Sequence, residues 1–332
     1  MSTVTEQTKP AAGRHDPKVI IALRRFAISI SVFNIIGYTV LGFEQPWAWP
    51  FAAVLTGYTT EIVLEVIGAY AEKRTPRFLG NGAKGVMEFL YPAHITSLAL
   101  QMLIYVNDRI WVMLFGVVLA VSAKWVLRAP VKGKLRHYMN PSNLGLASLL
   151  VLFPAWISIA PPYHFSEHVN DFVSWLIVGI IVASGTMLNA MLTGRMWLIL
   201  GWLSFFVLQA FVRGWMFGTS IPGALAMGTG IAFVLYTNYM VTDPGTSPSK
   251  PFPQFAFGAG IAIVYGFLMV AHIAYGLFFS TAIVCLIRGL FLWSLHWSLQ
   301  ARAKAAATET QSASVTPLPV AEAAEERAAK SA

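Results

Sequence analysis

Two glutamates, Glu61 and Glu65, lie one helical turn apart inside the apolar run 48–70. Residues four apart share one face of an α-helix. A carboxylate in hydrocarbon is costly, so both side chains should face protein or water, and such groups are candidates for ion passage, a proton relay or a counter-ion pair. Arg288, within another apolar run, is the charge expected to pair with one of them. A purely structural ion pair is the alternative.

Glu88 and His94 flank Pro92 in "FLYPAHIT" and are candidates for the same site. A proline within a helix removes a backbone donor and clashes with the preceding turn, so this pattern predicts a broken helix. A lone histidine is more often a hydrogen-bonded interior side chain than a ligand.

Two polar stretches, "RHYMNPSNLG" (136–145) and "YMVTDPGTSPSKP" (239–251), each precede an apolar run. Asn-Pro and Asp-Pro favour turns, and hydroxyl and amide side chains cap helix starts, so loop formation alone could explain both. The functional hypothesis is that two helix starts direct their dipoles and hydroxyls at a shared site, as discontinuous helices do in transporters. The expected N-caps are Ser142 or Asn143 for the first helix and Ser247 or Ser249 for the second. The binding candidates are Asn140, Ser142, Asn143, Thr242 and Asp243.

Motifs of soluble enzymes are absent from the sequence: there is no G-x-x-x-x-G-K-[ST], no G-x-S-x-G and no H-E-x-x-H. A primary ATP-driven pump is therefore disfavoured, and no catalytic residue is assigned. His164 and His168, with Glu167 between them, only loosely resemble a metal site, so no metal is expected. The single cysteine, Cys285, excludes an intrachain disulfide and a CxxC centre.

The composition indicates elements that lie in a lipid bilayer. The 332 residues are 56% hydrophobic and 11% charged, with a mean hydropathy of +0.62, whereas soluble domains are roughly 25% charged. Runs of spanning length predict an all-α polytopic membrane protein of about ten helices. The predicted segments are 26–43, 48–70, 85–105, 109–127, 143–160, 172–193, 196–216, 222–241, 254–277 and 279–299.

Basic residues are distributed as the positive-inside rule predicts for an even number of crossings. Only Arg109 and Arg213 lie in the outside loops. Both termini are therefore expected on the cytoplasmic side of a bacterial-type plasma membrane. The net charge of +8 then reflects topology and anionic lipid, and no nucleic-acid partner is expected. The inside group comprises Arg24, Arg25, Lys73, Arg74, Arg77, Lys84, Lys124, Arg128, Lys132, Lys134, Arg136, Arg195, Lys250, Arg302 and Lys304.

The predicted organisation has three parts. Residues 1–22 form a polar tail with no A-x-A-like cleavage site after the first apolar run, which favours a retained first span. Residues 23–300 form the transmembrane domain. Residues 301–332 are rich in Ala, Glu, Ser and Pro, and are expected to be disordered or partly helical and solvated.

"NPSNLG" followed by "LASLLVLFP", and "YMVTDPGTSPSKP" followed by "FAFGAGIAIVYG", resemble the paired signatures of the RnfD/NqrB family. Members are membrane subunits of Rnf-type and Na⁺-translocating NADH:quinone-reductase-type complexes. The similarity runs loosely from about Ala52 to Arg288, with Glu65 and Pro92 at matching positions. It implies ten helices in two inverted five-helix repeats, a fold akin to urea transporters, and flavin-linked electron and cation movement.

The family carries covalent FMN on a threonine of a long outer loop between the fifth and sixth helices. The corresponding loop here, "PPYHFSEHVND", is eleven residues without threonine. Covalent FMN is therefore not expected, and no other cofactor is required, although a flavin could bind non-covalently.

A further resemblance covers almost the whole membrane part. "RRFAISISVFNIIGYTVLGFEQPWAWP", "YPAHITSLALQMLIYVNDRIW", "APPYHFSEHVND" and "VASGTMLNAMLTGRMWLILGW" are similar to UnbU-type enediyne biosynthesis membrane proteins, relatives of RnfD. This resemblance implies metabolite transport or electron supply in enediyne-type secondary metabolism.

Three functions follow from these patterns. The first is transport of a small solute or cation through a polar site near the midplane, built from broken third and eighth helices, Glu61, Glu65 and Arg288. The second is a membrane electron-transfer subunit that binds flavin or quinone non-covalently and works with partner subunits. The third is a scaffold that holds biosynthetic enzymes through the basic loop 124–136 and the C-terminal tail.

Overall fold

Helices form at each of the ten predicted apolar runs, because in lipid a helix satisfies its backbone groups internally. The computed structural model describes residues 17–80, 82–131, 133–160, 162–165 and 168–314. The helices are α1 (Pro17–Ile36), α2 (Trp49–Ala71), α3 (Gly82–Leu103), α4 (Ile110–Val126), α5 (Pro141–Leu152), α6 (Asp171–Leu188), α7 (Met196–Phe217), α8 (Ile221–Ala226), α9 (Ile231–Leu235), α10 (Pro251–Val270) and α11 (Gly276–Ser314).

Short elements complete the described chain. π-helical turns extend α1, α6 and α9 over Gly37–Leu41, Asn189–Thr193 and Tyr236–Met240, and 3-10 turns cover Pro162–Phe165 and Met227–Thr229. β2 (Arg128–Val131) and β3 (Lys134–His137) form an antiparallel hairpin in which Arg128 pairs with His137. β1 (Ile104–Tyr105) pairs with β4 (Ser158–Ile159).

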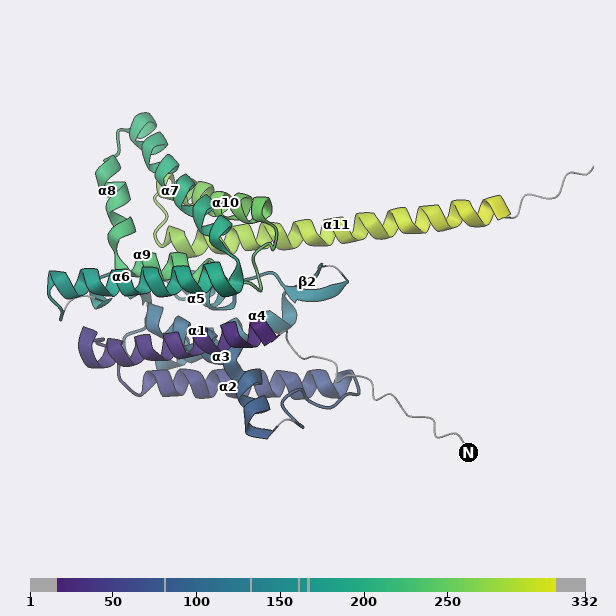
Figure 1. Ribbon diagram of the computed structural model, residues 1–332, viewed down its shortest axis with the longest axis horizontal. Coiled ribbons are helices and arrows are strands. Elements are labelled where there is room, and N and C mark those ends of the chain that lie inside the picture. The colour runs from purple at the N-terminus through teal and green to yellow at the C-terminus, as the bar shows by residue number, and fades with distance from the viewer. Residues whose placement is uncertain (1–16, 81, 132, 161, 166–167, 315–332) are drawn as a thin grey trace, which may run out of the picture.

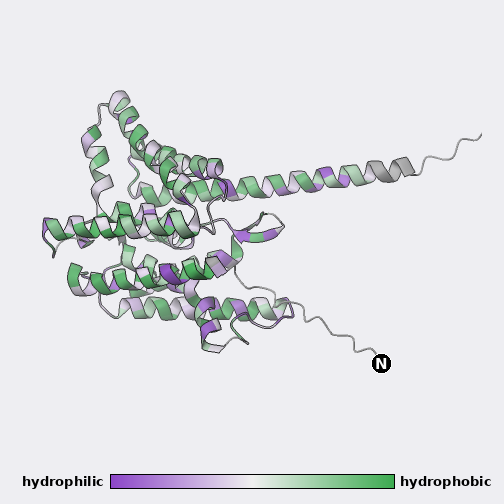
Figure 2. Ribbon diagram, in the orientation of Figure 1, coloured by the Kyte–Doolittle hydropathy of each residue, from purple (hydrophilic) through white to green (hydrophobic). Residues whose placement is uncertain are grey.

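The chain is an all-α polytopic membrane protein. Within its described part, six helices are long and apolar enough to cross a membrane, or seven if the bent pair α8–α9 is one span. Between 22% and 44% of an 18-residue window in each of the six spans is buried, and large side chains such as Trp215 and Phe267 are exposed. Figure 2 shows hydrophobic residues recurring along these helices. Exposed apolar side chains of this kind require lipid around them. Ten crossings and two inverted repeats remain predictions.

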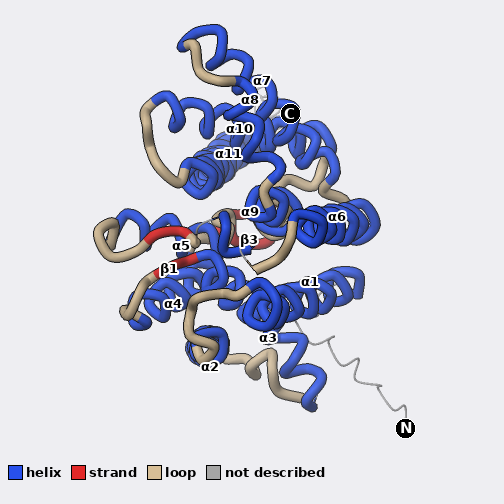
Figure 3. The backbone as a smooth tube through the Cα atoms, turned by 90° about the vertical axis from the view of Figure 1, so that its left-hand side faces the viewer, coloured by secondary structure: helices blue, strands red, loops and turns tan. Residues whose placement is uncertain are grey.

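The helices form two groups with a middle layer (Figures 1 and 3). α1 to α4 lie on one side, α7, α8, α10 and α11 on the other, and α5, α6 and α9 between them. α11 also contacts α5 and β2, so the last span ties the two groups together.

α7 and α10 are in backbone contact at two glycines. A Cβ on Gly258 would lie 2.2 Å from the Leu198 carbonyl oxygen, and one on Gly201 would lie 2.2 Å from the Phe255 carbonyl oxygen. Only glycine permits so close an approach.

The predicted break in the third helix is wrong. α3 continues from Gly82 to Leu103 with Pro92 inside it. One turn later, the Thr96 hydroxyl donates to the Pro92 carbonyl at 2.7 Å, and Ser97 donates to Ala93 at 2.8 Å. These hydroxyl bonds do not replace the bond that Pro92 cannot donate to the Glu88 carbonyl, four residues earlier. The helix continues in spite of that loss, packed between α1, α2 and α4.

The break in the eighth helix is confirmed. Gly230 is extended, with φ −76° and ψ 144°, and the axis bends by 68° between Ile221–Thr229 and Ile231–Met240.

The predicted N-caps are also wrong. Asn140 caps α5, with its side-chain oxygen accepting from the Asn143 amide at 3.0 Å. Lys250 precedes α10 without a side-chain cap bond. Pro251 begins that helix, where a missing N–H costs nothing.

The boundaries of the two tails differ from those predicted. α1 begins at Pro17, before residue 23, and α11 continues into the C-terminal tail as helix to Ser314, with residues 301–308 exposed. The tail is thus helical as far as residue 314. Residues 1–16 and 315–332 lie outside the described residues.

Candidate functional site

The two glutamates of α2 are neutralised by neighbouring basic groups. Glu65, with no exposed side-chain area, forms an ion pair with Arg74 and lies 2.6 Å from Arg77 Nη2. The Arg77 amide also donates to Glu65 Oε1 at 2.7 Å. Glu61 pairs across to α4, with Lys124 Nζ 2.9 Å from Oε2.

The expected pairing of Arg288 with a glutamate is wrong. Arg288 lies on α11, where its electrostatic neighbours include Arg136 and Arg195. The turn after α2, in which Lys73 adopts a positive φ of 51°, instead brings Arg74 back to Glu65.

Glu88 and His94 do not extend the acidic pair. Glu88 lies 4.0 Å from Lys84, one turn earlier. His94 bridges three helices, with its ring nitrogens 2.8 Å from Ser31 Oγ and 2.9 Å from Tyr58 Oη. Among the described residues no hydrogen bond or ion pair joins either side chain to Glu61 or Glu65, so His94 takes the structural role.

The two polar stretches do meet in space. Asn140 Nδ2 donates to the Met240 carbonyl at 2.7 Å, and Asn143 Nδ2 donates to Phe278 of α11 at 2.9 Å. Thr242 donates to Asn238 at 2.7 Å. The start of α10 contacts a different segment: the Gln254 side chain in its first turn donates to the Gly194 carbonyl at 2.9 Å. The α5 start thus meets Met240, at the end of the π-helical turn that precedes the 241–250 loop, and His137 of the first stretch lies 3.7 Å from Asp243 in that loop.

Asp243 organises that loop. Its oxygens accept from the Gly245 amide at 3.0 Å and from the Thr246 hydroxyl at 3.1 Å, and His137 lies at 3.7 Å. Burial acts to raise the pKa of Asp243, but His137 and these donors outweigh it and hold the pKa below its ordinary value of 3.8.

Asp243→Asn is therefore expected to reduce the free energy of unfolding by about 1.5–3 kcal/mol at neutral pH, the range for hydrogen bonds to a charged group. A carboxylate with a lowered folded-state pKa stabilises above its unfolded pKa, and this stabilisation is lost as pH falls through the folded value. The deficit should shrink below about pH 4, as measured by thermal unfolding in detergent. Asp108→Asn is the control, because that side chain is 85% exposed; an equal deficit at every pH would contradict the charge argument.

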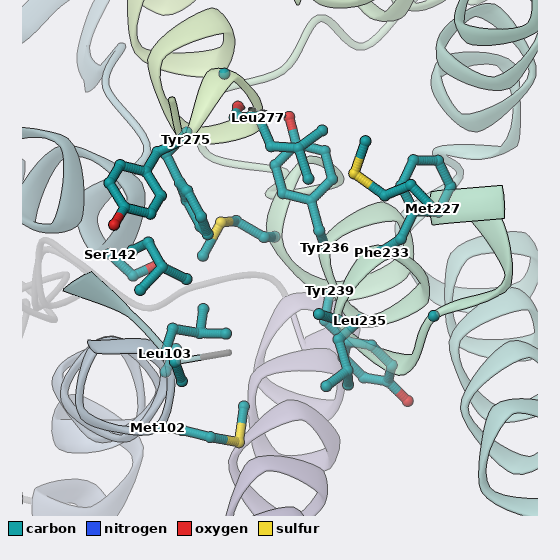
Figure 4. A pocket seen from close by; sticks show the side chains of 18 of the residues that line it. Met102, Leu103, Ser142, Met227, Phe233, Leu235, Tyr236, Tyr239, Tyr275 and Leu277 are labelled. Carbon is teal, nitrogen blue, oxygen red and sulfur yellow. Dashed lines mark hydrogen bonds between the residues drawn. The ribbon is translucent and has the colours of Figure 1, made fainter. Parts of the chain in front are cut away.

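A cavity of about 910 Å³ lies between the two helix groups (Figure 4). It is bounded by α1, α3 and the α5 start on one side, and by α9, the α10–α11 turn and the α11 start on the other. Its lining is largely apolar and contains no carboxylate, lysine or arginine. Of the ten sequence candidates, only Ser142 lines it.

Aromatic rings form one wall of this cavity. Phe233 and Tyr236 lie against Trp202, with ring centroids 5.8 and 5.4 Å away, and Trp202 Nε1 donates to Thr237 at 3.0 Å. The Tyr236 hydroxyl donates to the Leu277 carbonyl at 3.1 Å and also bonds Thr281. The sequence analysis did not identify Tyr236 as a candidate. The aromatic residues after Gly230, at the helix break, were the available signal.

His164, one of the two metal-like histidines, packs against an aromatic ring. His164 is 2% exposed and stacks on Phe43 at a centroid distance of 3.8 Å. Glu167 lies outside the described residues. No cluster of three or more His, Cys, Asp or Glu side chains suited to a metal occurs in the part of the chain that the structure describes.

No protein-family model matches the sequence, and no curated protein is similar to it.

Proposed function

We propose that this membrane protein is of the transport type and that it binds a small, mostly apolar solute in the cavity between its two helix groups. The observation that carries the proposal is the cavity itself, about 910 Å³ with an apolar lining and a few hydroxyl groups. Ligand pockets typically combine such a lining with a small number of placed polar groups.

The choice between solute and cation follows from charge. A cation path needs carboxylates or converging carbonyls, whereas Glu61 and Glu65 are held by Lys124, Arg74 and Arg77. The proposal therefore assigns solute binding to the cavity and a structural role to the acidic pair. The resemblance to the RnfD/NqrB and UnbU-type families also supports this proposal. It implies inverted repeats, as in transporters, and a link to enediyne-type metabolism.

The aromatic wall favours one alternative, an electron-transfer subunit with non-covalent flavin or quinone, because flat conjugated rings stack on aromatic side chains. An absorbance spectrum of the purified protein separates the two functions. A flavin or quinone spectrum would favour electron transfer, whereas a colourless protein with a bound solute would favour transport.

Ala99→Trp tests the cavity. Ala99 lines it from α3, so an indole there should fill the space and lower the amount of co-purified ligand at least tenfold, as measured by mass spectrometry of ligand extracted from the folded protein. Ala83→Trp, at an exposed position of the same helix, should leave the ligand unchanged. An unaltered ligand content in Ala99→Trp would place binding elsewhere.

A further inference from the structure

A second, smaller cavity adjoins the large one. Its volume is about 70 Å³, and it is lined from α1, α3, α6, α9 and the Pro162–Phe165 turn. The two cavities share three lining side chains, Phe33, Met102 and Leu235. No other residue of the described structure lines both cavities, so these three side chains form the wall between them.

The two spaces differ in chemistry. Every side chain that lines the small cavity is apolar, with isoleucines, leucines, phenylalanines and a methionine. The large cavity carries hydroxyls, including that of Tyr239, whose ring lies 5.5 Å from the Phe33 ring of the shared wall. In Figure 4, Tyr275 and Leu277, the partner of the Tyr236 hydroxyl, lie at one end and Met102 and Leu235 at the other.

The small cavity also lies close beneath the lipid-facing surface. Ile36 and Ile180 line it and are 36% and 54% exposed. Phe165 and Ile181, which line it as well, are 2% and 1% exposed. A chain that entered this space would pass from the large cavity toward the bilayer through a wholly apolar passage.

We infer that the ligand is an amphipathic molecule with a single alkyl chain, whose polar ring or head occupies the large cavity while its chain passes between Phe33, Met102 and Leu235 into the small one. This inference rests on the proposed function and adds the substrate class. The narrow volume suits a chain and not a second ring. The polarity difference fixes the direction, because burying a hydroxyl without a partner in the small cavity would be costly.

The test uses 4-octylphenol with a diazirine at the chain end, bound to the full-length protein in amphipol and photolysed, with the labelled residues mapped by mass spectrometry. The expected label lies on Phe165 and Ile181, which are 2% and 1% exposed, and excess unlabelled octylphenol removes it. Leu235→Trp closes the shared wall and should reduce this label at least tenfold. Phe33→Trp provides a second, milder closure if Leu235→Trp fails to fold.

Binding measurements separate the two levels of the argument. Phenol without a chain should bind the large cavity equally in wild type and in Ile177→Trp, because Ile177 lines the small cavity and not the large one, and neither probe should bind Ala99→Trp. If phenol and octylphenol bind the wild type but the chain end labels only large-cavity residues, the chain inference is overturned and solute binding stands. If neither probe binds the wild type, the proposed function fails with it.

Discussion

Gly258→Ala is expected to destabilise the protein by about 2–3 kcal/mol, the upper part of the range for overpacking. The added methyl would lie 2.2 Å from the Leu198 carbonyl oxygen and 2.7 Å from the Trp202 amide nitrogen. Both atoms belong to the α7 backbone, so the two helices must separate. Unfolding in mixed detergent micelles, followed by tryptophan fluorescence, measures the change.

Gly260→Ala is the matched control on the same helix. The nearest atom to a Cβ there is Val284 Cγ1 at 3.9 Å, an ordinary contact. Alanine is also the better helix former by about 0.8–1.0 kcal/mol, so this variant should be neutral or slightly more stable. Equal losses in both variants would show that α7 and α10 are not in backbone contact.

Replacement of both Arg74 and Arg77 by Gln is expected to cost about 3–5 kcal/mol, the range for breaking a buried ion pair from one side. The Glu65 side chain has no exposed area and would remain as a buried charge without a cation. Glu65→Gln should cost less, because Arg74 and Arg77 are 25% and 35% exposed and can turn to water. The free energy of unfolding of the purified variants measures both effects.

Lys84→Gln provides the control, since that side chain is 89% exposed and 4.0 Å from Glu88. Exposed pairs of this kind contribute little, so no measurable change is expected. If Glu65→Gln proved more damaging than the double arginine variant, the carboxylate would have a role beyond pairing.

The positions of the helices could be predicted from the sequence, because apolar runs of spanning length have few alternatives to helix in lipid. A break in the eighth helix was expected, and it lies at Gly230, where the backbone is extended. The break predicted at Pro92 is absent, because packing of α3 against α1 and α2 offsets the lost backbone bond, and a local pattern does not contain that packing.

The candidate site was predictable only in part. The stretches 136–145 and 239–251 do meet, through Asn140 and Met240, but the start of α10 contacts Gly194 instead, so a site shared by two helix starts stays a prediction. The predicted pairing of Arg288 with Glu61 or Glu65 was wrong. The sharp turn after α2 supplies the partners of Glu65, and contact between α2 and α4 supplies the partner of Glu61. The cavity could not be predicted, because it arises from packing between helix groups that are distant in sequence.

The last helix reaches well beyond the hydrocarbon. Its 39 residues span about 58 Å at 1.5 Å per residue, roughly twice the thickness of a bilayer core. About 28 Å of rod must therefore stand in water, with Arg302 and Lys304 among its first charges past the apolar part. A soluble protein bound to this part of α11 would be held at a fixed distance from the membrane surface. Because α11 contacts α5, any tilt of α11 caused by that protein would also move the α5 start.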